Sequence, residues 1–217
     1  PRVGADLGHL ESWLTANDFT IRRLIRDDIL AEDAADDADL VIILGSVWTM
    51  TRVMDTPNDP PQAADAIAAE VALVRRRLAQ DKPTLGLCFG AQLMSHALGG
   101  EVTQQDSTVI AWDRPDTEIP EMQKPWMLLH QDRFTLPPGA ELLAEAEHAT
   151  VGFRHGRSWA LQFHAEVDAD ALRGMFEDLG LPPEEWSEYV EYVQERSDEN
   201  REQALALFDR FWDEVGE

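Results

Sequence analysis

A single cysteine stands where the chain changes from a strand-like to a helix-like pattern. Residues 83–96 read PTLGLCFGAQLMSH, so a short apolar run ends in Gly-Leu-Cys-Phe-Gly and helix-forming residues follow at once. This pattern predicts a strand-to-helix elbow, in which small flanking residues let a nucleophile stand in a strained turn. Cys88, the only cysteine of the protein, is the candidate nucleophile.

A candidate base and its orienting group end a second apolar run. Residues 161–167 read LQFHAEV, so His164 and Glu166 are two residues apart and share one face of an extended segment. A thiol needs a base to become a thiolate, and that base needs a third group to hold its tautomer. Cys88, His164 and Glu166 therefore form a candidate catalytic set, each at the carboxyl end of a predicted strand.

The elements that must position these residues alternate along the first half of the chain. We predict a helix over residues 7–17, a strand over 19–25, a strand over 38–45 buried on both faces of a parallel sheet, and a helix over 61–80. The helix after Cys88 ends at 99–100, where two glycines occur. This order predicts an α/β fold, a doubly wound and mostly parallel sheet with flanking helices.

The second half changes character. Short strands are predicted over residues 141–146, 151–154 and 158–163, the last two joined by a tight turn at His155-Gly156, which gives a small antiparallel hairpin region. After Leu181 the chain is helical and acidic, with an apolar stripe of Ala204, Phe208, Phe211 and Val215. We divide the chain into a catalytic domain, 1–180, and an acidic C-terminal helical extension, 181–217, whose stripe we expect to pack on its own domain rather than on a partner.

The two motifs together resemble the class I (triad) glutamine amidotransferases, in which a G-x-C-x-G-x-Q elbow precedes a strand ending in H-P-E. Residues 129–137, LHQDRFTLP, resemble the H-G-D-x-F-x-L-P segment of the branch related to the amidotransferase part of GMP synthase. The resemblance implies a flavodoxin-like fold. Family members open with a buried strand, and residues 1–5 resemble the loop after it, which indicates a trimmed sequence or a sheet without that strand.

The resemblance also implies roles for five further residues. The N–H of Phe89 and the turn at Ser46, where the family usually has glycine, would form an oxyanion hole. Gln92, one helical turn after the cysteine, would bind the amino-acid end of glutamine. His130 and Asp132 would contact the substrate or place a loop at the mouth of the site, with a solvated loop as the alternative interpretation.

Three functions fit this residue set. In the leading one, Cys88 attacks the side-chain amide of glutamine, ammonia leaves, water hydrolyses the thioester, and a separate synthase chain receives the ammonia. The second is a stand-alone γ-glutamyl peptide hydrolase with the same triad. The third is a non-catalytic relative of the fold, which the intact His164 and Glu166 disfavour. No cofactor is expected.

Composition narrows the setting. A formal net charge of −24 over 217 residues argues against binding to nucleic acid or to an anionic membrane. One cysteine cannot form an internal disulfide, so we expect a cytoplasmic protein, and six scattered histidines predict no metal site. Lysine occurs only at 82 and 124. Such an acidic, lysine-poor surface resembles proteins of salt-loving microbes, although a GC-rich genome also favours arginine over lysine.

Overall fold

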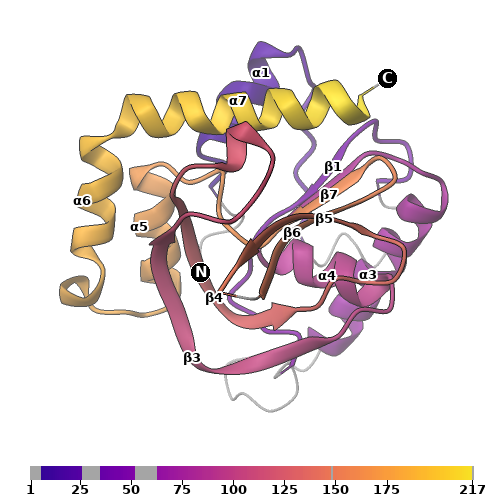
Figure 1. The fold of residues 1–217 in the computed structure, drawn as a ribbon, viewed down its shortest axis with the longest axis horizontal. Helices are drawn as coiled ribbons and strands as arrows, with labels where there is room; N and C mark the ends of the chain where they lie inside the picture. Colours follow the sequence, from indigo (N-terminus) through magenta and orange to yellow (C-terminus); the bar gives the residue numbers. More distant parts are fainter. Residues whose placement is uncertain (1–5, 26–34, 52–62, 148, 217) are drawn as a thin grey trace. The chain divides into compact units, whose positions relative to one another are not determined.

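The computed structural model describes residues 6–25, 35–51, 63–147 and 149–216 (Figure 1). The chain divides into two compact units. The larger unit comprises residues 24–164 and 214–217, and the smaller unit comprises residues 1–23 and 165–213. The N-terminal residues 1–5, on which the interpretation of a missing first strand depends, lie outside the described residues.

The larger unit is built on a five-stranded sheet. Its order is β1 (Val41–Ile43), β2 (Thr84–Leu87), β7 (Ser158–Leu161), β6 (Ala149–His155) and β5 (Glu141–Ala146). The first three strands are parallel, whereas β7, β6 and β5 pair antiparallel. Helices α3 (Ala63–Ala79) and α4 (Phe89–Ala97) flank the sheet (Figure 1). The predicted α/β fold with a small antiparallel region is confirmed.

The predicted helical periodicity of residues 61–80 produces the packed face of α3. Ile67, Val71, Val74 and Leu78 are all buried. The first two pack in a cluster with Phe89 and Leu93 of α4, and the last two in a cluster with α4 and the sheet. The helix that follows the cysteine is therefore held from one side by α3.

A second, two-stranded sheet completes the larger unit. Strand β3 (Val102–Asp113) pairs antiparallel with β4 (Trp126–Phe134), with Ile110 opposite Leu129 and an irregularity between Gln104 and Val109. A short 3-10 helix, Pro120–Met122, lies between the two strands in sequence. Strand β4 reaches the main sheet through an isolated bridge between Met127 and His164.

Two local predictions are wrong. Residues 19–25 form no strand: Ile21 and Ile25 are exposed, while the ring of Phe19 packs on Trp13 and Trp212 at centroid distances of 5.6 and 5.0 Å. The hairpin turn between β6 and β7 is Gly156-Arg157, because His155 still pairs with Ser158, and Gly156 has a positive φ of 54°.

The strand predicted over residues 38–45 is shorter and less buried than expected. Only Val41–Ile43 pair with β2, and all three are half-buried. Among the described residues β1 has β2 as its only strand neighbour, so one of its edges is not covered by a second strand. The apolar run is therefore parallel, as predicted, but is not a central strand of the described sheet.

The smaller unit is helical. It contains α1 (His9–Ala16), α5 (Ala169–Asp178), the 3-10 helix Pro183–Glu185, α6 (Ser187–Glu195) and most of α7 (Ser197–Val215). Phe208 of α7 packs on Trp13 of α1 at 5.7 Å, and the indole N–H of Trp13 donates to Asp209. Ala204, Phe208, Phe211 and Val215 are buried, so the stripe packs within its own chain, as expected.

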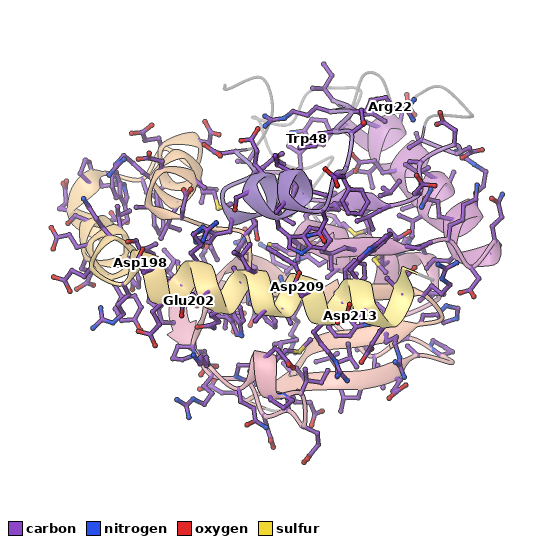
Figure 2. All side chains as sticks on the ribbon, turned by 90° about the horizontal axis from the view of Figure 1, so that it is seen from above. Arg22, Trp48, Asp198, Glu202, Asp209 and Asp213 are labelled. Carbon is purple, nitrogen blue, oxygen red and sulfur yellow. The ribbon has the colours of Figure 1, made fainter. Side chains whose placement is uncertain are left out.

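Acidic side chains occupy several exposed positions of α7. Asp198, Glu202, Asp209 and Asp213 are all exposed and are distributed along the helix (Figure 2). The helix is thus apolar on one face and acidic on the other. The predicted division into a domain over 1–180 and an extension over 181–217 remains a prediction. In the structure, α1 and α5 belong to the same compact unit as most of the C-terminal helical residues.

Candidate active site

Cys88 occupies a left-handed backbone conformation between β2 and α4. Its φ is 51° and its ψ is −104°, a region that non-glycine residues adopt only at a cost of about 1–3 kcal/mol. Two glycines make this turn possible. A Cβ on Gly86 would lie 2.7 Å from the backbone of Gly90, and a Cβ on Gly90 would overlap the carbonyl of Ile43. The strand-to-helix elbow predicted from the sequence is therefore present.

His164 lies next to this elbow. It follows β7, and its backbone N–H donates to the carbonyl of Met127 at 2.8 Å. A Cβ built on Gly45 would lie 2.9 Å from Cε1 of His164 and 3.7 Å from Cβ of Cys88. The turn after β1 thus lies beside both the candidate base and the candidate nucleophile, and it accepts no residue larger than glycine at position 45 without moving the imidazole.

Glu166 is fully buried and belongs to the smaller unit. Its carbonyl accepts a hydrogen bond of 2.8 Å from the N–H of His9, at the start of α1. A Cβ on Gly8 would overlap the same carbonyl, which explains the glycine with a positive φ of 48° at this position. The main chain of Glu166 is thereby fixed against α1. The pairing of its carboxylate with His164 stays a prediction.

The two expected oxyanion donors lie at different kinds of turn. Phe89 is the first residue of α4, where backbone N–H groups favour negative charge. Ser46 directly follows Gly45, and its Oγ accepts a hydrogen bond of 2.9 Å from the N–H of Trp48. Ser46 is not among the described residues with positive φ, so serine replaces the usual glycine there without left-handed strain.

Asp132 fastens the loop that carries Ser46. Its buried carboxylate accepts hydrogen bonds from both the side chain and the backbone N–H of Thr51, at 2.6 and 3.2 Å. Thr51 is five residues after Ser46, and it lies in a loop rather than in a strand or helix. Of the two interpretations of Asp132, the contacts therefore favour placement of a loop over solvation.

His130 is a half-buried, neutral imidazole beside the site. Its Nδ1 lies 2.9 Å from the carbonyl oxygen of Asp132, an acceptor, and the tautomer of the ring decides whether this nitrogen donates to that carbonyl or accepts from a neighbouring donor. Burial lowers the pKa of His130 to about 4; the hydrogen bond to Asp132 opposes this shift, and nearby His164 adds to it. Gln105 lies 3.2 Å from the same nitrogen. His130 is thus uncharged at neutral pH.

Gln92 is turned inward. Its amide nitrogen donates to the carbonyl of Asp132 at 3.1 Å and to Oε1 of Gln162 at 3.4 Å. Gln162 in turn directs its own amide nitrogen at Sγ of Cys88, 3.6 Å away, and the thiol contacts the carbonyl of Leu129 at 3.5 Å. Sequence reasoning did not find Gln162. The available signal was a single polar residue inside the apolar run that ends at the histidine.

The described residues contain no cluster of three or more histidine, cysteine or acidic side chains that would hold a metal ion. Among the same residues no helix has the length and apolar character needed to cross a bilayer.

Solved structures of similar shape are glutamine amidotransferases. One from Methylobacillus flagellatus matches with a TM-score of 0.73 at 22% identity, and covers 97% of this chain and 91% of its own. Another, from Thermotoga maritima, matches with a TM-score of 0.70 at 19% identity, and covers 95% and 93%. At these identities the likeness shows the fold.

Sequence comparison gives longer relatives. A GMP synthase (glutamine-hydrolysing) from Bdellovibrio bacteriovorus is 30% identical over an alignment of 115 residues, and the match covers 48% of this chain and 23% of that protein. The chain thus spans about a quarter of the length of the curated relatives that it matches. The sequence profile named "Glutamine amidotransferase class-I" matches residues 23–177. Since that match covers well over half of the chain, the protein belongs to the class I glutamine amidotransferase family.

Proposed function

We propose that this protein is a glutaminase that releases ammonia from glutamine through a thioester on Cys88. The observation that carries the proposal is the position of Gly45 beside both proposed reacting residues: an ideal Cβ added there would lie 2.9 Å from Cε1 of His164 and 3.7 Å from Cβ of Cys88. Cys88 also has the strained backbone of a nucleophile elbow. Family membership supplies the class of substrate.

In the proposed reaction His164 takes the thiol proton, and the Cys88 sulfur attacks the carboxamide carbon of glutamine. The tetrahedral intermediate collapses as the imidazolium gives its proton to the leaving nitrogen, so ammonia departs and a thioester remains. His164 then deprotonates a water molecule, which attacks the thioester. Glutamate leaves, and the sulfur regains its proton. Glu166 would hold the imidazole in the required tautomer.

The remaining predicted site residues have matching roles in this proposal. The N–H groups of Phe89 and Ser46 would donate to the oxyanion, which is usually the largest electrostatic contribution to acyl transfer. Asp132 would hold the loop of Ser46 in place through Thr51. His130, being neutral, would line the site as a polar group without repelling the ammonium of the substrate.

We further propose that the ammonia is delivered to a separate synthase chain. The relatives named as GMP synthases are about four times as long as their match to this protein. A synthase of the kind named in these relatives would be the acceptor of the ammonia.

The test is a substrate comparison. Purified protein is given glutamine or a panel of γ-glutamyl peptides, and glutamate and ammonia are measured separately. The proposal expects equal amounts of glutamate and ammonia from glutamine, and none from a Cys88→Ser variant, because a hydroxyl is a far poorer nucleophile with this base. Hydrolysis that persists in the serine variant would refute the role of Cys88. Faster cleavage of γ-glutamyl peptides than of glutamine would identify a γ-glutamyl hydrolase instead.

A further inference from the structure

We propose that Gln162 and Gln92 form an amide relay that holds the sulfur of Cys88 and stabilises its thiolate. In this relay Gln162 donates to the sulfur, and Gln92 is a positioning residue that fixes the orientation of Gln162. The inference rests on the proposed role of Cys88 as the nucleophile. It adds two residues to the reaction, one of which, Gln162, has no role in the triad or the oxyanion hole.

One backbone carbonyl determines the orientation of both side-chain amides, because each donor has to face an acceptor. The carbonyl of Asp132 only accepts hydrogen bonds, so the Gln92 atom 3.1 Å from it must be the nitrogen. The second hydrogen of that nitrogen points to Gln162 at 3.4 Å, which must then present its oxygen. The other end of the Gln162 amide is therefore N–H, and it faces Sγ of Cys88 at 3.6 Å. If the Gln92 amide were reversed, its oxygen would face the carbonyl of Asp132, two acceptors together. If the Gln162 amide were reversed, its nitrogen would face the nitrogen of Gln92, two donors together.

The two contacts of the sulfur respond differently to ionisation. The thiol S–H donates to the carbonyl of Leu129 at 3.5 Å, and this bond disappears when the proton leaves. The N–H of Gln162 remains and then donates to a negative charge, and such charge-assisted hydrogen bonds are stronger than neutral ones. Gln162 therefore favours the thiolate over the thiol, which is the direction required for attack.

The contact between Gln162 and the sulfur is buried, which increases its effect on the ionisation of the thiol. Cys88, Gln162 and Gln92 are 5, 1 and 3% exposed, so bulk water does not replace a lost donor at this position. The relay also ends on a rigid partner, since Asp132 lies in β4, which pairs along β3. For the substrate role predicted for Gln92, both hydrogens of its amide are already used, which leaves its oxygen as the atom available to glutamine.

The relay is tested by alkylation, because the protein has one cysteine and modification by iodoacetamide reports Cys88 alone. Rates are measured at pH 7 and at pH 10 by intact mass, for the native protein and for Gln162→Leu. At pH 7 the variant should react about tenfold more slowly, the size expected for one lost hydrogen bond to a charged group. At pH 10, above the pKa of about 8.5 of an ordinary cysteine, we expect the two rates to agree.

Further variants separate the relay from a general loss of packing. Gln92→Leu should slow the pH 7 reaction in the same direction, and the double variant should be no slower than Gln162→Leu, because both changes break one chain of contacts. Ser95→Ala is the matched control: it removes the bond from α4 to the carbonyl of Thr135, 2.9 Å long, without touching the relay. Its ratio of rates at pH 7 and pH 10 should equal that of the native protein.

Two outcomes would overturn the relay. One is an unchanged rate at pH 7 in Gln162→Leu, and the other is an equal loss at both pH values. Should Gln162→Leu fail to fold, as judged by thermal unfolding, Gln92→Leu decides by the same criteria. Since alkylation needs no turnover, the relay and the proposed function fail separately: a native protein that does not hydrolyse glutamine refutes the function and leaves the alkylation result unaffected.

Discussion

The hydrogen bonds between Thr51 and Asp132 should couple stability to catalysis. Thr51→Val removes the 2.6 Å bond from the hydroxyl to a carboxylate that is only 1% exposed, while the backbone N–H keeps its contact of 3.2 Å. A hydrogen bond to a charged group contributes about 1.5–3 kcal/mol, and the exposure of Thr51 favours the lower end, so we expect a loss of about 1.5 kcal/mol. For a chain of this size that lowers Tm by about 3–6 °C.

The same change should reduce activity more than stability. Thr51 holds the loop that carries Ser46, and a displacement of about 1 Å at a reacting group can cost about a hundredfold in rate. Thermal unfolding and the kcat for glutamine would be measured together, with Thr15→Val as the control. That threonine makes an exposed bond to the carbonyl of Glu11, so its loss should matter little. A Thr51→Val protein with native kcat and a lowered Tm would refute the link between the loop and catalysis.

Four other perturbations test the remaining arguments. His164→Ala should lower kcat by at least the 10²–10⁴-fold typical of acid–base catalysis, and Glu166→Gln should cost less; equal, small effects would indicate another base. The pKa of His130 is lowered to about 4, against 6.5 for an ordinary histidine, so between these pH values the unfolded chain binds more protons than the folded one. The free energy of unfolding should therefore fall as pH drops from about 6.5 to about 4, and chemical unfolding of His130→Gln should show a flatter dependence on pH. Deletion of residues 198–217 should lower Tm and solubility, because burial of each aromatic side chain of the stripe contributes roughly 1.5–3 kcal/mol to stability. An unchanged Tm with an altered elution volume on sizing would instead indicate that the stripe docks on a partner. If the net charge of −24 is an adaptation to salt, Tm should rise steeply between 0.1 M and 1 M potassium chloride, over which the Debye length falls from about 10 to about 3 Å, and a flat curve would favour the GC-rich genome.

The sequence was most informative where a local constraint decides the structure. The turn at Cys88 needs the two glycines at 86 and 90 whatever surrounds it, and the structure shows the backbone contacts that a larger residue would break. The spacing of Ile67 and Val71 on α3 likewise follows from helical geometry alone. Both features were therefore predictable from short windows of residues.

Contacts between distant residues were not predictable in this way. Gln162 meets the sulfur of Cys88 from 74 positions away, and Thr51 meets Asp132 from 81 positions away. No local pattern encodes such a pair. The wrong strand at 19–25 has a related cause, since its alternating apolar residues would need a neighbouring strand, and Phe19 packs instead on aromatic rings of two helices. The hydrophobic pattern of a segment indicates which secondary structure it favours, whereas tertiary packing decides which one it adopts.

Strand β4 carries most of the anchoring points of the site. The carbonyls of Met127, Leu129 and Asp132 receive His164, the thiol of Cys88 and the amide of Gln92. A slip of one residue in the pairing with β3 would turn every one of these positions to the opposite side. Substitutions along β3, which holds none of the proposed catalytic residues, should therefore be able to lower the proposed activity. Any attempt to graft the proposed site onto another protein has to transplant the two-stranded ribbon along with Cys88, His164 and Glu166.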